Sequence, residues 1–123
     1  MITIDSNVSE DNIGGTIEVT IGAMTLMSKD DYIEDIHAAW DAFFQLLKEE
    51  TCQFVLKGGR TTIFTLVTGT NGVQLQVKKI DLRGMALTLN SGYISEQVFL
   101  TTLEDAYHSF YLSKKINQTH HYS

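Results

Sequence analysis

The sequence predicts an α+β fold, in which an antiparallel sheet of about five strands is packed by two amphipathic helices as a two-layer sandwich. Two segments, 29–50 and 95–115, carry apolar residues at helical spacing. Several shorter segments alternate apolar and polar residues, as strands with one solvated face do. The connections between these segments are short, which favours antiparallel neighbours.

The chain begins with a predicted loop and a predicted strand. Residues 5–15 are polar and end in a pair of glycines, which indicates a loop. After them Ile17, Val19 and Ile21 alternate with polar residues, which predicts a strand. Gly22 interrupts the alternation and indicates a bulge or a bend.

Segment 29–50 predicts the first long helix. Ser28 is a suitable N-cap, and the acidic residues after it suit the positive end of the helix dipole. One side of this helix collects the apolar residues Tyr32, Ile33, Ile36, Trp40, Phe43, Phe44 and Leu47. The other side collects Asp31, Glu34, Asp35, Asp41, Gln45 and Glu49. The pattern therefore places an aromatic stripe in the core and an acidic face in solvent.

Four strands are expected after this helix, at residues 52–57, 61–68, 73–80 and 85–89. Between the second and third of them, Asn71-Gly72 favours a tight type I′ turn. The turn places Phe64 and Leu66 opposite Val77 and Lys79, or near Leu75, and points Gln74, Gln76 and Lys78 outward. Ser91-Gly92 is expected to end the last strand.

The second long helix is predicted to begin after Ser95, which can cap it. Its core stripe is Phe99, Leu103, Ala106, Tyr107 and Phe110. Residues 117–123 are expected to form a flexible tail. Because no linker or low-complexity tract interrupts the chain, residues 1–123 are predicted to form a single α+β domain.

The composition excludes several classes of function. The 123 residues are 43% hydrophobic and 20% charged, and nine scattered basic residues in a chain of net charge −6 argue against nucleic-acid binding. No segment approaches the ~20 apolar residues of a membrane span, and the N-terminus lacks the pattern of a secretory signal. Cys52, the one cysteine, cannot form an internal disulfide. These features predict a cytoplasmic protein.

Carboxylates and histidines occur at helical spacing in both long helices. Glu34, His37 and Asp41 could meet along one helix edge, as could Glu104, Asp105 and His108. A di-iron site would need more carboxylate-bearing helices, and a zinc site would need three or four converging ligands. Nucleophile-elbow, phosphate-loop and HExxH motifs do not occur. Cys52 lies in an apolar run, so we expect a buried, inert thiol. We therefore expect no enzyme activity, no metal and no cofactor.

The acidic residues are concentrated in the first part of the chain. Residues 1–50 carry eleven acidic and two basic side chains, a net charge of −9, whereas residues 51–123 carry four acidic and seven basic ones, a net charge of +3. A surface of one sign attracts a partner of the other sign, although the same charges also suit a helix that is merely solvated. The expected partner-binding residues are Asp5, Glu10, Asp11, Asp31, Glu34, Asp35, Asp41 and Glu49, with Tyr93 as an aromatic anchor. The rival surface is the outward side of the sheet around Gln74, Gln76 and Lys78.

Four segments carry a resemblance in layout to a known group of proteins. They are GTIEVTI at 15–21, AAWDAFFQLL at 38–47, GTNGVQLQV at 69–77 and ISEQVFLTTL at 94–103. Together they span most of the chain, whose order of elements resembles small bacterial immunity proteins of contact-dependent growth inhibition and related polymorphic-toxin systems. The resemblance implies that a monomer binds a cognate toxin domain one to one and blocks its active site or substrate path. A nuclease toxin would present a basic surface that suits an acidic inhibitor.

A secretion-type chaperone is the alternative that the sequence leaves open. Such chaperones are also small, acidic and α+β, but they dimerise and hold an extended effector segment along a sheet or groove. They would be expected to expose apolar patches. Oligomeric state and the folded or extended form of the ligand distinguish the two hypotheses.

Overall fold

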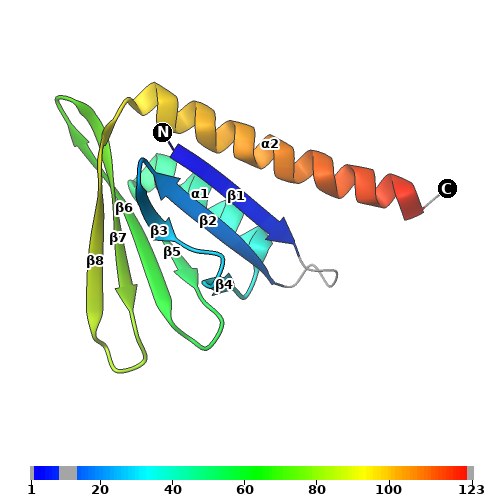
Figure 1. The fold of residues 1–123 in the computed structure, drawn as a ribbon, viewed down its shortest axis with the longest axis horizontal. Helices are drawn as coiled ribbons and strands as arrows, with labels where there is room; N and C mark the ends of the chain where they lie inside the picture. Colours follow the sequence, from blue (N-terminus) through cyan, green and yellow to red (C-terminus); the bar gives the residue numbers. More distant parts are fainter. Residues whose placement is uncertain (1, 9–13, 122–123) are drawn as a thin grey trace.

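The computed structural model describes residues 2–8 and 14–121, with side chains placed for residues 2–5 and 14–110. It confirms the α+β class with antiparallel strands, but the described chain has eight strands in two sheets of four rather than about five in one sheet. Sheet A contains β1 (Ile2–Val8), β2 (Gly15–Ile21), β3 (Met24–Met27) and β4 (Tyr32–Ile33). Sheet B contains β5 (Thr51–Val55), β6 (Thr61–Gly69), β7 (Gly72–Ile80) and β8 (Ala86–Ile94). The helices are α1 (Ile36–Glu49) and α2 (Glu96–His121), as Figure 1 shows.

The first strand of sheet A, β1, extends into the segment 5–15 in which the sequence predicts a loop. β1 pairs antiparallel with β2 in an unbroken register from Ile2↔Ile21 to Val8↔Gly15. Residues 5–8 are therefore a strand, although their polar sequence carries no apolar alternation. Pairing with a neighbouring strand supplies the hydrogen bonds that hold them extended, and this contact is invisible to local patterns. The turn from β2 to β3 contains Gly22 with a positive φ of 62°, where a bend is predicted.

The first helix begins later than predicted, at Ile36, with Asp35 as its N-cap. The Asp35 carboxylate accepts hydrogen bonds from the backbone N–H groups of His37, at 3.0 Å, and Ala38, at 3.3 Å. These bonds satisfy two of the first backbone donors, which have no partner within a helix. The helix start predicted at Ser28 is therefore wrong.

The segment before α1 forms a turn and a short strand instead of helix. The backbone N–H of Asp31 donates to the Ser28 carbonyl at 3.0 Å, which closes a turn. Tyr32 and Ile33 then pair with Thr16 and Gly15 of β2. Sheet pairing thus overrides the helical spacing of these apolar residues.

Sheet B has the strand order β5-β6-β7-β8 and confirms the predicted apolar pairing. Phe64 lies opposite Val77, and Leu66 lies opposite Leu75. The connecting turn consists of Thr70-Asn71, and neither residue has a positive φ. A type I′ turn requires positive φ at both central positions, so that prediction is wrong.

The last strand of sheet B continues past the predicted stop at Ser91-Gly92. The register between β7 and β8 shifts between Gln74 and Gln76, which marks a bulge in β8. There the backbone N–H of Leu75 donates to the Ser91 Oγ at 2.9 Å. The bulge satisfies the local donor and lets the strand run on to Ile94.

The core joins α1 to both sheets. The centroid of the Phe43 ring lies 4.8 Å from that of the Phe54 ring in β5 and 5.6 Å from that of the Phe64 ring in β6. Ile33 of β4 forms an isolated antiparallel bridge with Leu56, which joins sheet A to the segment after β5. Of the aromatic residues that the sequence places in the core, Trp40, Phe43, Phe99 and Phe110 are buried, whereas Phe44 is half-buried.

The second helix begins directly after Ser95, as predicted, and lies beside β1 (Figure 1). Phe99, Leu103 and Phe110 of α2 are buried, and the Tyr107 ring lies 5.8 Å from that of Trp40 in α1. The backbone is helical to His121, through the segment 117–121 in which a flexible tail is predicted. Neither helix of the described chain has a stretch long and apolar enough to cross a membrane.

Candidate functional site

The exposed side of α1 carries a stripe of polar residues. Asp41, Gln45 and Glu49 follow one another at four-residue spacing and are all exposed, and Gln45 Nε2 donates to Glu49 Oε2 at 2.8 Å. Glu34 and Asp35 are exposed just before the helix. Glu34, Asp35, Asp41 and Glu49 are termed the acidic face below. They extend along about 20 Å of helix and its first cap, and Lys48 is the one Lys or Arg in α1.

The acidic face is held on a fixed support. Trp40, Phe43 and Leu46, on the opposite side of α1, are each at most 2% exposed. The cap at Asp35 fixes the beginning of the same helix. Because the backbone is anchored by burial and by the cap, the carboxylates can meet a partner with little reorganisation.

Asp31 is not part of the acidic face. Its Oδ2 accepts hydrogen bonds from Lys79 Nζ and from the backbone N–H of Ser28, both at 3.0 Å. The Asp31 side chain is 15% exposed and that of Lys79 29%. Because Asp31 precedes β4 and Lys79 belongs to β7, the ion pair links sheet A to sheet B. Asp31 therefore has a structural role, because its ion pair with Lys79 joins the two sheets.

The pKa of the Asp31 carboxyl lies below its ordinary value. Burial raises the pKa, but the hydrogen bonds from Ser28 and the hydrogen bond and positive charge of Lys79 lower it further. The charged form is thus favoured in the folded protein relative to the unfolded chain. It contributes stability that is present above the ordinary carboxyl pKa and is lost as the pH falls through the folded pKa.

Replacing Asp31 with asparagine is expected to destabilise the protein by about 1 kcal/mol at pH 7, because the partly exposed ion pair is lost. The difference from the wild type should shrink as the pH falls below about 4. Urea unfolding at pH 7 and at pH 3 measures both values. Asp30→Asn, at an exposed neighbouring position, is the matched control and should be nearly neutral. An Asp31→Asn effect that is equal at both pH values would contradict the ionic role.

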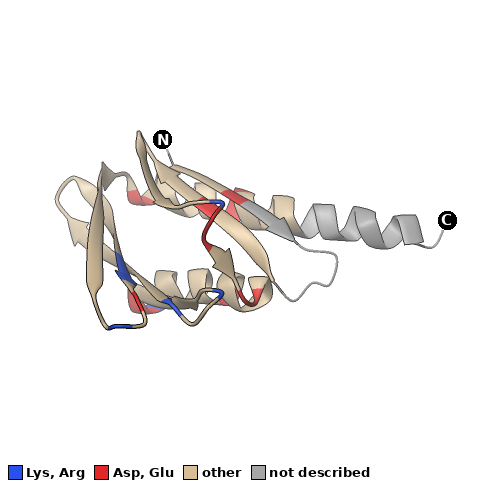
Figure 2. Ribbon diagram, turned by 60° about the horizontal axis from the view of Figure 1, so that its bottom comes forward, with Lys and Arg blue, Asp and Glu red and all other residues tan. Residues whose placement is uncertain are grey.

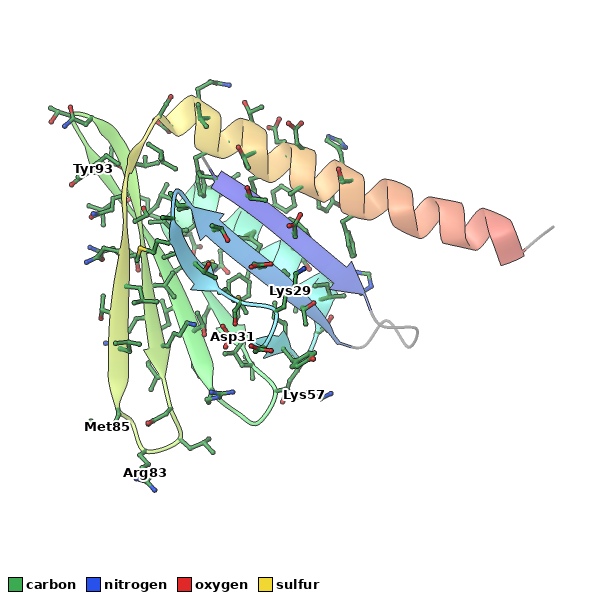
Figure 3. The ribbon with its side chains drawn as sticks, in the orientation of Figure 1. Lys29, Asp31, Lys57, Arg83, Met85 and Tyr93 are labelled. Atoms are coloured by element: carbon green, nitrogen blue, oxygen red, sulfur yellow. The ribbon has the colours of Figure 1, made fainter. Side chains whose placement is uncertain are left out.

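The other predicted partner residues lie away from α1. Asp5 is exposed on β1, where its neighbours Ile2 and Ile4 are buried, so it points to the side of sheet A opposite the core. Tyr93 lies on β8, is 48% exposed, and occupies the far end of sheet B in Figure 3. Glu10 and Asp11 lie outside the described residues. The structure therefore groups four of the predicted residues on the acidic face and separates Asp5, Asp31 and Tyr93 from it.

The Cys52 and His37 side chains, which could have carried chemistry, lie against apolar residues. Burial raises the pKa of the Cys52 thiol to about 12, against a smaller lowering from a hydrogen bond with the Phe64 backbone. The thiolate is scarce at neutral pH, which removes this nucleophile. His37 packs edge-on against Phe110, with ring centroids 6.0 Å apart. Among the side chains placed for residues 2–5 and 14–110, no three His, Cys, Asp or Glu are grouped closely enough to hold a metal ion.

A cavity at one end of sheet B, beside Asp31, is a feature that the sequence did not predict. Its volume is about 340 Å³, and the residues around it include Leu56, Arg60, Lys79, Ile80, Met85 and Leu87. Two of these, Met85 and Leu87, are 69% and 59% exposed. The apolar residues Leu82, Met85 and Leu87 are a signal in the sequence, but only the folded structure places Met85 and Leu87 beside this cavity.

Basic residues gather at the same end of sheet B. Lys57 and Arg60 belong to the turn after β5, Lys78 to the end of β7, and Arg83 to the turn between β7 and β8. Figure 2 shows these positive positions toward the ends of the hairpins. The side chain of Leu82 approaches the position of a Cβ on Gly59 to 3.2 Å, so the two turns are neighbours. The chain matches no protein-family model, no curated protein and no solved structure.

Proposed function

We propose that this protein is an inhibitor of the immunity type, which binds a basic domain of a cognate toxin and blocks its active site or substrate path. The observation that carries the proposal is the acidic face: Asp41 and Glu49 are exposed on the anchored helix α1, and Glu34 and Asp35 are exposed directly before it. The resemblance in layout to immunity proteins and the net charge of −9 in residues 1–50 support the same function.

The physical basis of the proposal is electrostatic steering. A nuclease domain presents Lys and Arg to hold phosphates, and an acidic helix that covers this surface competes with the substrate. Complementary charges raise association rates to about 10⁸–10⁹ M⁻¹ s⁻¹ at low salt. Salt should slow association, because exposed charges are screened. An interface of roughly 1,200–2,000 Å² in a one-to-one complex is sufficient.

A secretion-type chaperone is the second candidate. The exposed apolar side chains of Leu82, Met85 and Leu87 favour it, because a chaperone needs apolar surface for an unfolded segment. Such a chaperone would be an obligate dimer, and its complex with the effector segment would change little as the salt concentration rises. Stoichiometry and salt dependence therefore separate the two candidates.

The test is reversal of two charges on the acidic face, Asp41→Lys with Glu49→Lys. Both side chains are exposed, and a lysine near the end of α1 suits the helix dipole, so melting should change little. Association with the toxin domain, followed by stopped-flow fluorescence, should slow by about tenfold or more and lose most of its salt dependence.

The matched control reverses two exposed carboxylates of α2, Glu104→Lys with Asp105→Lys. It changes the net charge by the same amount at positions outside the predicted partner-binding set. If both double variants slow association equally, the total charge and not the acidic face governs binding. An unchanged rate and full inhibition in the Asp41/Glu49 variant would remove the acidic face from the interface.

A further inference from the structure

The free edge of β8 is an unprotected strand edge. β8 pairs with β7 on one side, and no other described strand pairs with its outer side. Its sequence, ALTLNSGYI, contains no charged residue and no proline, which are the residues that usually protect an edge from further pairing. The bulge lies near Ser91, so residues 86–90 keep a regular register and present backbone donors and acceptors outward.

Apolar side chains accompany this edge on the side of the cavity. Leu87 lies opposite Lys79, and Leu89 lies opposite the buried Val77, so both leucines point to the inner side of sheet B. Leu87 is 59% exposed and borders the cavity of about 340 Å³. A strand added beside β8 would place alternate side chains over Leu87 and into this cavity, because side chains alternate between the two faces of a sheet.

Charge favours one kind of segment for this position. Lys57, Arg60, Lys78 and Arg83 lie at the end where β8 begins, and none of them forms an ion pair with a described carboxylate. Asp81 is the acidic residue of the β7–β8 turn, and its Oδ1 accepts hydrogen bonds from the backbone N–H groups of Arg83 and Met85. The four cations, of which Lys57 Nζ also lies 5.8 Å from the centroid of the Tyr32 ring, outnumber Asp81, so this end attracts negative charge.

We propose that β8 and the cavity beside it bind an extended segment of a partner protein by strand addition. The segment carries apolar side chains at alternate positions and acidic residues at the end that lies near Arg83 (Figure 3). Main-chain hydrogen bonds along β8 hold it, and the cavity and the cations select its side chains. This surface is separate from the acidic face, so the inference does not rest on the proposed function.

The test uses the full chain, labelled with ¹⁵N, and synthetic peptides of alternating valine and threonine. Two peptides carry a pair of glutamates at one end or the other, because the strand direction is open, and two carry lysines there instead. At least one glutamate peptide should bind saturably and shift the amide signals of residues 86–90. The lysine peptides should bind about tenfold more weakly, because the cations repel them.

Leu87→Ser removes the apolar contact at an exposed position and should weaken the binding of the glutamate peptide by about tenfold. Val55→Ser is the matched control, because Val55 is 47% exposed on β5, the opposite edge of the same sheet. Arg83→Glu should reduce the ratio between the affinity for the glutamate peptide and the affinity for the lysine peptide. The variant with Asp41→Lys and Glu49→Lys should bind the peptides like the wild type, whatever happens to toxin binding.

Three results would overturn the inference. The first is no saturable binding of either glutamate peptide at millimolar concentration. The second is equal binding by Leu87→Ser and the wild type. The third is a dimer in sedimentation whose formation shifts the signals of residues 86–90 without peptide, since a second copy of the chain would then occupy the edge.

Discussion

Trp40→Ala is expected to destabilise the protein by about 3–5 kcal/mol, the largest effect of a single core truncation in this chain. The Trp40 side chain is 2% exposed. The centroid of its ring lies 5.6 Å from that of Phe43 on the same helix. It lies 5.8 Å from the ring centroid of Tyr107 and 5.6 Å from that of Phe110, both on α2. Truncation therefore removes the ring that joins α1 to α2, and with it the support of the acidic face.

The measurement is urea unfolding followed by circular dichroism, because Trp40 is the one tryptophan and its fluorescence is lost in the variant. Trp40→Phe is the control. The indole Nε1–H of Trp40 is buried without a hydrogen-bond partner in the described structure. Replacement by phenylalanine therefore removes an unsatisfied donor and keeps an aromatic ring. We expect it to destabilise by less than about 2 kcal/mol. Equal losses for alanine and phenylalanine would show that the indole N–H is essential and contradict this packing.

Gly72→Ala is expected to destabilise the protein by roughly 2–4 kcal/mol. Gly72 begins β7 with a φ of 116°, a conformation that side chains disfavour. A Cβ at this position would clash with the carbonyl oxygen of Ile94, at the end of β8. Backbone atoms cannot turn aside as a flexible side chain can, so the two strands must separate locally.

Gly92→Ala is the matched control for that change. A Cβ on Gly92 would meet no atom within 4 Å, and its φ is not positive. The same substitution should therefore change stability by less than about 1 kcal/mol. Thermal unfolding of both variants tests the close approach of β7 to Ile94, and an undisturbed Gly72→Ala protein would show that this approach is wrong.

Local patterns in the sequence predicted the features that depend on neighbours along the chain. The spacing of Trp40 and Phe43 gave the buried side of α1, and the alternation around Phe64 and Val77 gave the register of the β6–β7 pair. The start of α1 was wrong because Tyr32 and Ile33 pair with β2, a contact between distant segments. Strand β1 was missed for the same reason, since its polar residues are held by pairing with β2.

In the candidate site too, local sequence predicted some features, whereas others depend on contacts between distant segments. Asp41 and Glu49 lie on the exposed side of α1, as their helical spacing predicts. Asp31 could not be separated from them by sequence, because its partner Lys79 is 48 residues away. Helical spacing also gave no sign that Asp35 caps the helix, since Ser28 is an equally good capping residue. The cavity beside Leu87 is lined by residues from Asp31 to Leu87 that only the fold brings together, so no local pattern contains it.

Inhibition of a basic partner domain through the acidic face of α1 is the proposal to test first. The most direct measurement is capture of partners by the tagged protein from a lysate of its source cells, followed by size-exclusion chromatography with light scattering. We predict a one-to-one complex with a folded basic domain, which dissociates as salt rises and is lost in the variant with Asp41→Lys and Glu49→Lys. A dimer of this chain that holds an extended segment and is indifferent to those substitutions would contradict it.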